Sequence, residues 1–245
     1  MSSLTTAVSK KIGKALAKYN MLKNGETILV AVSGGKDSLV LLHYLVEKRK
    51  RLPVDYDLRA LHIRTDVSPN EHWSAYRHAV EAMGVKLDTV DISLLSRLAP
   101  GKRMNCYWCA TQRRMELLKH AAAYGIEKIA LGHHMDDILE TFLMNMMYRS
   151  ELSTMLPVFK YDKYPCTIIR PLSLVKESEI ALVAAELGYS DIISQCNCGE
   201  RSKRKEIRKS LDYLCREGEY IRDALFRAME NSKPRYLPAG NPVHR

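Results

Sequence analysis

A glycine-rich turn between an apolar strand and an apolar helix is the part of this sequence that most directly predicts chemistry. Residues 33–38 read Ser-Gly-Gly-Lys-Asp-Ser and lie between the apolar runs 28–32 and 39–45. In such a turn, backbone N–H groups point outward at the positive end of the helix dipole, and Lys36 adds a full charge. The two glycines let the backbone approach an anion closely. The turn therefore predicts a phosphate site, although it lacks the Gly-x-x-x-x-Gly-Lys-Ser/Thr spacing of the Walker loop.

Two pairs of closely spaced cysteines form a second candidate site. Cys106 and Cys109 lie at a predicted helix start, where thiolates are stabilised, and Cys196 and Cys198 lie far along the chain. Four thiolates can ligate zinc, and three can hold an iron–sulfur cluster that leaves one iron open to a substrate. The first pair alone would suffice for thiol–disulfide chemistry. The spacing leaves all three alternatives open.

A third candidate segment, 132–137, reads Gly-His-His-Met-Asp-Asp and follows a predicted strand. Paired carboxylates beside a phosphate site can bind Mg²⁺ or orient a reacting group, and an aspartate at a helix start can also cap the helix. We expect one of Asp136 and Asp137 to cap and the other to act in the site. His133 and His134 suit a metal ligand, a base or a neutral hydrogen-bonding role.

These segments need a scaffold that brings them together. The hydrophobic pattern predicts strands at 28–32, 56–63, 85–90, 128–131 and 165–169, and helices at 8–19, 38–48, 71–83, 106–124, 136–148 and 176–187. It predicts a loop at 94–105 and an extended tail at 232–245. Alternating strands and helices indicate an α/β fold with a doubly wound parallel sheet, in which ligands bind beyond the carboxyl ends of the strands. The segments that follow residues 32, 63 and 131 should therefore converge on one crevice.

Size and composition favour a globular cytoplasmic protein. The chain has 245 residues, of which 46% are hydrophobic, enough for a sizeable core. It contains no apolar run near the ~20 residues that span a bilayer, and residues 2–20 are polar and lysine-rich, unlike a signal peptide. Thiols stay reduced in the cytosol, which favours metal ligands over disulfides. Cys166 is predicted in an apolar strand and Cys215 in a helix, and both are expected to pack as small hydrophobic residues.

The charge distribution favours a polyanionic partner. The net charge is +10, and residues 201–209 hold six positive charges against one acid, Glu206. A second basic run occupies residues 48–51. Such clusters bind nucleic acids through counterion release. Arg113 and Arg114, one helical turn beyond Cys109, can face phosphate, RNA or solvent.

In their order along the chain, these segments resemble the signatures of the tRNA 2-thiocytidine synthetases, a group of ATP pyrophosphatases with a pyrophosphate (PP) loop. The resemblance covers roughly residues 10–215 and rests on the turn 33–38, Cys106-x-x-Cys109 followed by Arg113-Arg114, Gly132-His-His-x-Asp-Asp137, Arg170-Pro-Leu172 and Cys196-Asn-Cys198-Gly199. It implies the adenine-nucleotide-hydrolase type of Rossmann-like fold. The turn alone is shared with NAD, GMP, argininosuccinate and tRNA lysidine synthetases, whereas its combination with the cysteines is far more specific.

The resemblance implies ATP- and cluster-dependent sulfur transfer to tRNA. In that family, ATP adenylates the C2 oxygen of a cytidine in the anticodon loop, at position 32, and pyrophosphate leaves. Sulfide held on the open iron of a [4Fe–4S] cluster then displaces AMP. Adenylation is needed because an oxygen at C2 is a poor leaving group.

The resemblance also implies roles for individual residues. It assigns catalysis to Lys36, Asp37, Arg113 and Asp137, and binding of ATP and Mg²⁺ to Ser33, Gly34, Gly35, Lys36, Asp37, Ser38, His62, Gly132 and Asp136. The implied cluster ligands are Cys106, Cys109 and Cys198. The family often has Cys-Asn-x-Cys-Gly at the later site, one residue longer than here. Alignment on Gly199 selects Cys198 and leaves Cys196 as the alternative.

The expected partners are tRNA and a sulfur donor such as a cysteine desulfurase, with no membrane and with a homodimer carried over from the family. We expect a PP-loop ATP pyrophosphatase domain over residues 1–215 and a C-terminal helix with a tail over 216–245. Two enzymatic alternatives stay open: a tRNA 2-thiouridine synthetase, and a PP-loop sulfurtransferase acting on another RNA or a small molecule. A third alternative is an iron–sulfur RNA-binding protein without turnover.

Overall fold

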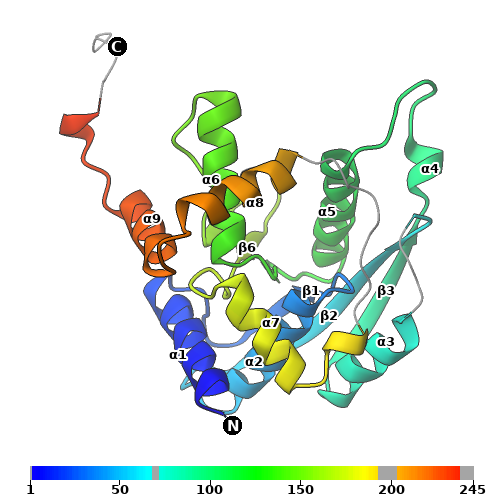
Figure 1. The fold of residues 1–245 in the computed structure, drawn as a ribbon. Coiled ribbons are helices and arrows are strands. Elements are labelled where there is room, and N and C mark those ends of the chain that lie inside the picture. Colours follow the sequence, from blue (N-terminus) through cyan, green and yellow to red (C-terminus); the bar gives the residue numbers. More distant parts are fainter. Residues whose placement is uncertain (1, 68–71, 193–202, 238–245) are drawn as a thin grey trace. The chain divides into compact units, whose positions relative to one another are not determined.

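The computed structural model describes residues 2–67, 72–192 and 203–237, and these fold into two compact units (Figure 1). The first comprises Met1–Ile138 and Met155–Ser202, and the second Leu139–Thr154 and Lys203–Arg245. The second unit thus combines most of one central helix with the C-terminal helices. The division that we expected after residue 215 stays a prediction.

The first unit is built on a six-stranded sheet in the order β3-β2-β1-β4-β6-β5. The strands are β1 (Glu26–Ala31), β2 (Tyr56–Thr65), β3 (Lys86–Ile92), β4 (Lys128–Ala130), β5 (Val158–Lys160) and β6 (Thr167–Ile169). All neighbouring strands are parallel except β5 and β6, so the predicted α/β class with a largely parallel sheet is confirmed. Strand β5 was not predicted, because a largely exposed edge strand of three residues has no hydrophobic period.

Helices cover both faces of this sheet (Figure 1). Helices α1 (Ser3–Lys18), α2 (Lys36–Arg49), α3 (Trp73–Ala82) and α7 (Glu177–Glu186) belong to one core, and α5 (Cys106–Ala123) packs on the other face. The alternation along β1 explains this arrangement. Ile28 and Val30 enter the first core and Leu29 enters the second, because successive strand residues point to opposite faces. The predicted two-sided coverage is therefore present.

Shorter elements refine the sequence predictions. The predicted loop 94–105 begins with a single helical turn, α4 (Leu94–Arg97), whose N-cap Ser93 accepts a hydrogen bond from the Ser96 amide. The predicted tail contains a short 3₁₀ turn, Pro234–Tyr236, and another 3₁₀ turn spans Ser190–Ile192. Single turns escape detection by periodicity because a period needs several residues. Within the described residues, no helix is long and apolar enough to cross a bilayer.

In the second unit a buried carboxylate holds two helices together. Helix α6 (Met135–Arg149) begins in the first unit and continues into the second, where α8 (Lys203–Leu214) lies across it and α9 (Tyr220–Glu230) follows (Figure 1). Glu140 of α6 is fully buried, and its two carboxylate oxygens accept bonds from Arg204 Nε at 2.6 Å and Arg208 Nε at 2.7 Å. Such charge-assisted bonds offset the cost of burying the carboxylate.

This pairing means that not all positive charges of the basic segment 201–209 are available to an external partner. Arg204 and Arg208 point inward to Glu140, and the Lys203 ammonium lies 4.4 Å from the centre of the Tyr148 ring. Lys205 and Lys209 are exposed. Some of the positive side chains that were expected to bind a polyanion therefore form ion pairs within the protein.

We predict that the double substitution Arg204→Ala/Arg208→Ala loosens α8. It would leave the Glu140 carboxylate buried without its two guanidinium partners, a cost of about 3–5 kcal/mol for an uncompensated buried charge. Hydrogen exchange at the α8 amides should accelerate accordingly. The matched control, Lys205→Ala/Lys209→Ala, removes the same charge from the exposed residues of this helix and should leave exchange nearly unchanged. Equal protection in the two variants would show that Glu140 does not anchor α8.

Candidate functional site

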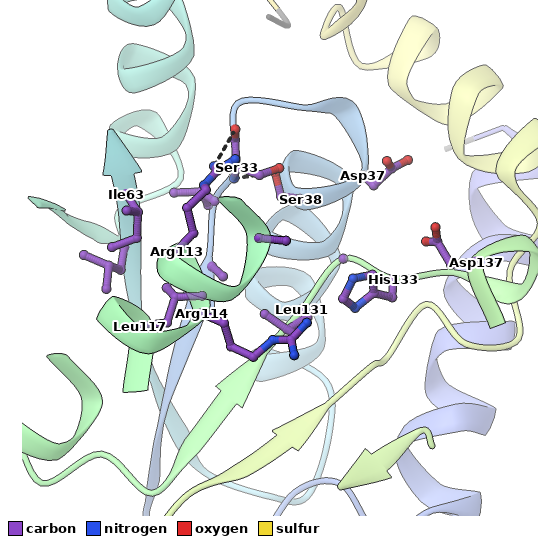
Figure 2. A pocket seen from close by; sticks show the side chains of 15 residues that line it. Ser33, Asp37, Ser38, Ile63, Arg113, Arg114, Leu117, Leu131, His133 and Asp137 are labelled. Atoms are coloured by element: carbon purple, nitrogen blue, oxygen red, sulfur yellow. Dashed lines mark hydrogen bonds between the residues drawn. The ribbon is translucent and has the colours of Figure 1, made fainter. Parts of the chain in front are cut away.

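A pocket of about 310 Å³ lies at the carboxyl ends of β1, β2 and β4, between α5 and the first turn of α2 (Figure 2). Its walls combine apolar side chains with a few polar ones, as in most small-molecule sites. The lining residues are Ala31, Val32, Ser33, Asp37, Ser38, Leu61, Ile63, Ala110, Arg113, Arg114, Leu117, Leu131, Gly132, His133 and Asp137. The three strand ends that the sequence analysis expected to converge do meet here.

The turn 33–38 forms one rim of this pocket. Gly34 has φ +91°, a conformation that favours glycine, and Gly35 is the N-cap of α2. The Ser38 hydroxyl braces the turn: it accepts a bond from the Ser33 amide at 3.1 Å and donates to the Gly35 carbonyl at 2.9 Å. It also lies 2.9 Å from the buried Tyr76 hydroxyl. The first amides of α2 are thereby held in a fixed position at the positive end of the helix dipole.

Lys36 and Asp37, at the start of α2, form a small charge network with α7. Lys36 Nζ lies 3.3 Å from Asp37 Oδ1 and 3.1 Å from Glu177 Oε1. Burial lowers the pKa of Lys36, but the two carboxylates outweigh this and raise it. Burial raises the pKa of Asp37, an effect that Lys36 partly offsets. A cation in the pocket would favour the ionised Asp37 in the same way.

The two aspartates of segment 132–137 face different neighbours. Asp136 is buried, and its Oδ2 accepts a bond from the Glu177 amide at 2.7 Å, at the first residue of α7. Asp137 lines the pocket, and its Oδ2 accepts a bond from the His134 amide at 3.0 Å. Asp136 therefore holds the start of α7, while Asp137 lies where a ligand can reach it.

Arginines supply the positive charge of the pocket. Arg113 and Arg114 extend into it from α5, and Arg113 Nη2 lies 3.5 Å from the Ser33 carbonyl, at the limit of a hydrogen bond (Figure 2). Arg170, which follows β6, is only 8% exposed. Burial, with a smaller contribution from Arg114, lowers the pKa of Arg170 to about 10, so it is still charged at neutral pH. Its Nε donates to Nδ1 of His133 at 3.2 Å.

The cysteine pair lies at the start of the same helix that carries the pocket arginines. Cys106 and Cys109 occupy the first turn of α5, and the N-cap Asn105 accepts a bond from the Trp108 amide at 2.9 Å. Cys106 is exposed and Cys109 is half-buried. Cys196 and Cys198 lie outside the described residues, and the described part of the chain holds no group of three or more potential metal ligands.

The predicted site residues divide into those that line the pocket and those that lie outside its lining. Of the predicted set, the pocket lining includes Ser33, Asp37, Ser38, Arg113, Gly132 and Asp137; it does not include Gly34, Gly35, Lys36, His62 and Asp136. His62 lies between the lining residues Leu61 and Ile63 of β2, so its side chain is on the opposite face of the strand. Its ring centroid is 4.1 Å from that of Trp73, and its Nδ1 is 2.8 Å from the Val32 carbonyl oxygen. Burial lowers the pKa of His62, which favours its neutral form.

Two contributors were missed by the sequence analysis. Tyr76 and Glu177 reach the turn from helices distant in sequence, and neither belongs to a local motif. Cys166 and Cys215 are buried, as predicted, and burial raises the pKa of Cys166 to about 11.

Known proteins resemble this chain over most of its length. Residues 4–213 match the family model of the PP-loop domain. The tRNA-cytidine(32) 2-sulfurtransferase of Syntrophotalea carbinolica is 35% identical over 241 residues, which cover 94% of this chain and 90% of that protein. The protein of the same name from Geotalea uraniireducens is 36% identical over 243 residues, covering 96% and 94%.

A solved structure extends the likeness to three dimensions. The U34-tRNA thiolase NcsA from Methanococcus maripaludis, determined with its [4Fe–4S] cluster, is 25% identical. It superposes with a TM-score of 0.78 and covers 93% of this chain and 78% of its own.

We predict that Gly132→Ala weakens nucleotide binding. A Cβ at Gly132 would lie 3.1 Å from the backbone of Asp37 and Ser38, so the first turn of α2 would have to move. Overpacking of this kind costs about 1–3 kcal/mol, and if this displaces the α2 amides, ATP affinity measured by calorimetry should fall by roughly 5- to 150-fold. The control is Gly13→Ala in α1, where the new Cβ meets only the flexible end of Lys48. If Gly132→Ala binds ATP as the wild type does, the close approach is not required.

Proposed function

This chain belongs to the PP-loop domain family and, within it, to the tRNA-cytidine(32) 2-sulfurtransferases, and we propose that it replaces the C2 oxygen of cytidine 32 in tRNA with sulfur. The observation that carries the proposal is the construction of α5. One helix bears Cys106 and Cys109 in its first turn and, one turn later, Arg113 and Arg114 in the pocket wall. Two thiols and two guanidinium groups are thus held on one rigid element.

The first step is adenylation of the nucleobase. The C2 oxygen attacks the α-phosphate of ATP, an O–P bond forms, and the bond to the leaving pyrophosphate breaks. The amides at the start of α2 bind the phosphates, and Lys36 and Arg113 stabilise the charge that develops on pyrophosphate. In the second step sulfur bonds to C2, and the C2–O bond breaks with release of AMP.

The cysteines and aspartates of the site are residue types that bind an iron–sulfur cluster and Mg²⁺, respectively. Cys106 and Cys109 would ligate a [4Fe–4S] cluster together with Cys198, for which Cys196 is the alternative. The spacing of three residues within one helical turn lets both thiols of the first pair face the same ligand. When bound, the cluster supplies an iron site for the sulfur. Asp37 and Asp137 would hold Mg²⁺ at the phosphates, because carboxylate oxygens are the ligands that this ion prefers.

The partners follow from the charge and the reaction. The exposed Lys205 and Lys209 of α8 would contact tRNA phosphates, and a cysteine desulfurase would supply the sulfur. We also propose a homodimer in the cytoplasm. A 2-thiouridine product is the second candidate, because NcsA is a U34-tRNA thiolase and shares the fold.

Two substitutions should distinguish the role of the cysteine pair from that of the turn at residues 33–38. We predict that Cys109→Ala abolishes cluster retention and thiolation but leaves ATP binding largely intact, since the thiol lies outside the pocket lining. Lys36→Ala should keep the cluster and slow AMP formation by roughly 100-fold, the effect of losing one charge-stabilising group. Cluster content is read from the visible absorption spectrum, and AMP from chromatography. Normal thiolation by Cys109→Ala would sink the cluster assignment.

The substrate is tested by mass spectrometry of nucleosides from total tRNA, in cells with and without the gene. We expect selective loss of 2-thiocytidine, restored by the wild-type gene and not by Lys36→Ala. Loss of 2-thiouridine instead would retain the chemistry and change the substrate. If all thionucleosides persist, tRNA is not the acceptor.

A further inference from the structure

His133 lies in the pocket wall against the buried guanidinium of Arg170. Arg170 Nε donates to His133 Nδ1 at 3.2 Å, and its Nη1 donates to the Leu156 carbonyl. Arg170 is 8% exposed, so two bonds fix a side chain that has little room to move. A guanidinium has only donors, and therefore Nδ1 of His133 must be the acceptor.

This contact determines where the proton of His133 resides. A neutral imidazole carries one proton, and with the Nδ1 lone pair engaged that proton is on Nε2. A second proton would have to enter at Nδ1, directly opposite the Arg170 N–H. His133 is thereby held as a neutral ring with Nε2–H as its only donor.

The backbone places this ring beside the predicted phosphate site. Gly132, the preceding residue, approaches the first turn of α2 so closely that a Cβ would lie 3.1 Å from the Ser38 nitrogen. His133 and Asp137 both line the pocket, and Figure 2 shows the His133 ring between Leu131 and the Asp137 carboxylate. A donor on this ring would therefore lie at the edge of the pocket in which the nucleotide is proposed to react.

We propose that His133 is a catalytic residue that donates its Nε2–H to a non-bridging oxygen of the ATP α-phosphate while the nucleobase attacks. Arg170 is the positioning residue that sets the tautomer. No proton is transferred: the hydrogen bond strengthens as charge builds on the phosphoryl oxygens. The role in turnover rests on the proposed function, whereas the tautomer does not.

The same geometry argues against His133 as the general base. A base must offer a lone pair to the proton that it removes, and on this ring the Nδ1 pair is engaged by Arg170 while Nε2 carries the proton. Cytosine O2 also has no proton to lose when it attacks. The adenylation step therefore needs a hydrogen-bond donor to the phosphoryl oxygens and not a base.

The tautomer is tested directly by long-range proton–nitrogen NMR of protein labelled with ¹⁵N-histidine. The His133 signals are assigned by their loss in His133→Gln. We expect the pattern of a neutral ring protonated at Nε2 at pH 7, and a mixture of tautomers in Arg170→Met. A ring protonated at Nδ1, or an imidazolium, in the wild type would overturn the proposal.

Kinetics test the role in the reaction. His133→Ala should lower kcat for tRNA-dependent AMP release by about 100-fold while the Kd for ATP changes less than about threefold, because the bond strengthens only in the transition state. His133→Gln, whose amide N–H can replace Nε2–H, should recover most of the rate. The control is His78→Ala, at an exposed position on α3.

The outcomes distinguish this proposal from the function on which it rests. A normal kcat in His133→Ala, or a Gln variant as slow as the Ala variant, would refute the donor role. If wild-type protein released no AMP in the presence of tRNA, the proposed function and the role in turnover would both fail. The NMR signature would then still report whether Arg170 sets the tautomer.

Discussion

The close approach of segment 132–137 to the first turn of α2 is the constraint on which the site depends. Gly132 has no side chain, and this lets the end of β4 contact the backbone of Asp37 and Ser38. The parallel pairing of β1 with β4 brings the two strand ends to the same edge of the sheet. This one approach therefore brings the first amides of α2 close to Asp137 and His133. The hydroxyls of Ser38 and Tyr76 then prevent the turn from relaxing.

Two buried charged groups of the described residues are held by hydrogen bonds within the protein, and the charges engaged in this way are not available to a substrate. Glu140 engages Arg204 and Arg208, and Arg170 is held by His133 and a backbone carbonyl. The net charge of +10 is therefore a poor guide to any single surface. The guanidinium groups in the pocket lining are those of Arg113 and Arg114 of α5.

Much of the architecture was predictable because it depends on local periodicity. The alternation of β1 between two cores, the turn at 33–38 and the cysteine pair at the start of α5 all follow from residues close together in sequence. The convergence of three strand ends follows from a general property of parallel sheets. The edge strand β5 and the single turn α4 were missed, because three or four residues do not establish a period.

The sequence by itself determined the fold class, the glycine-rich turn before α2 and the residue types available to the site. Only the tertiary structure decided which of these residues act together. Asp136 holds α7 while Asp137 lines the pocket, although both are acidic and adjacent. His62 packs on Trp73, whereas His133 receives a proton donor from Arg170. The physical reason is that a contact is chosen by position in space: Asp136 and Glu177 are 41 residues apart along the chain, and His133 and Arg170 are 37 residues apart.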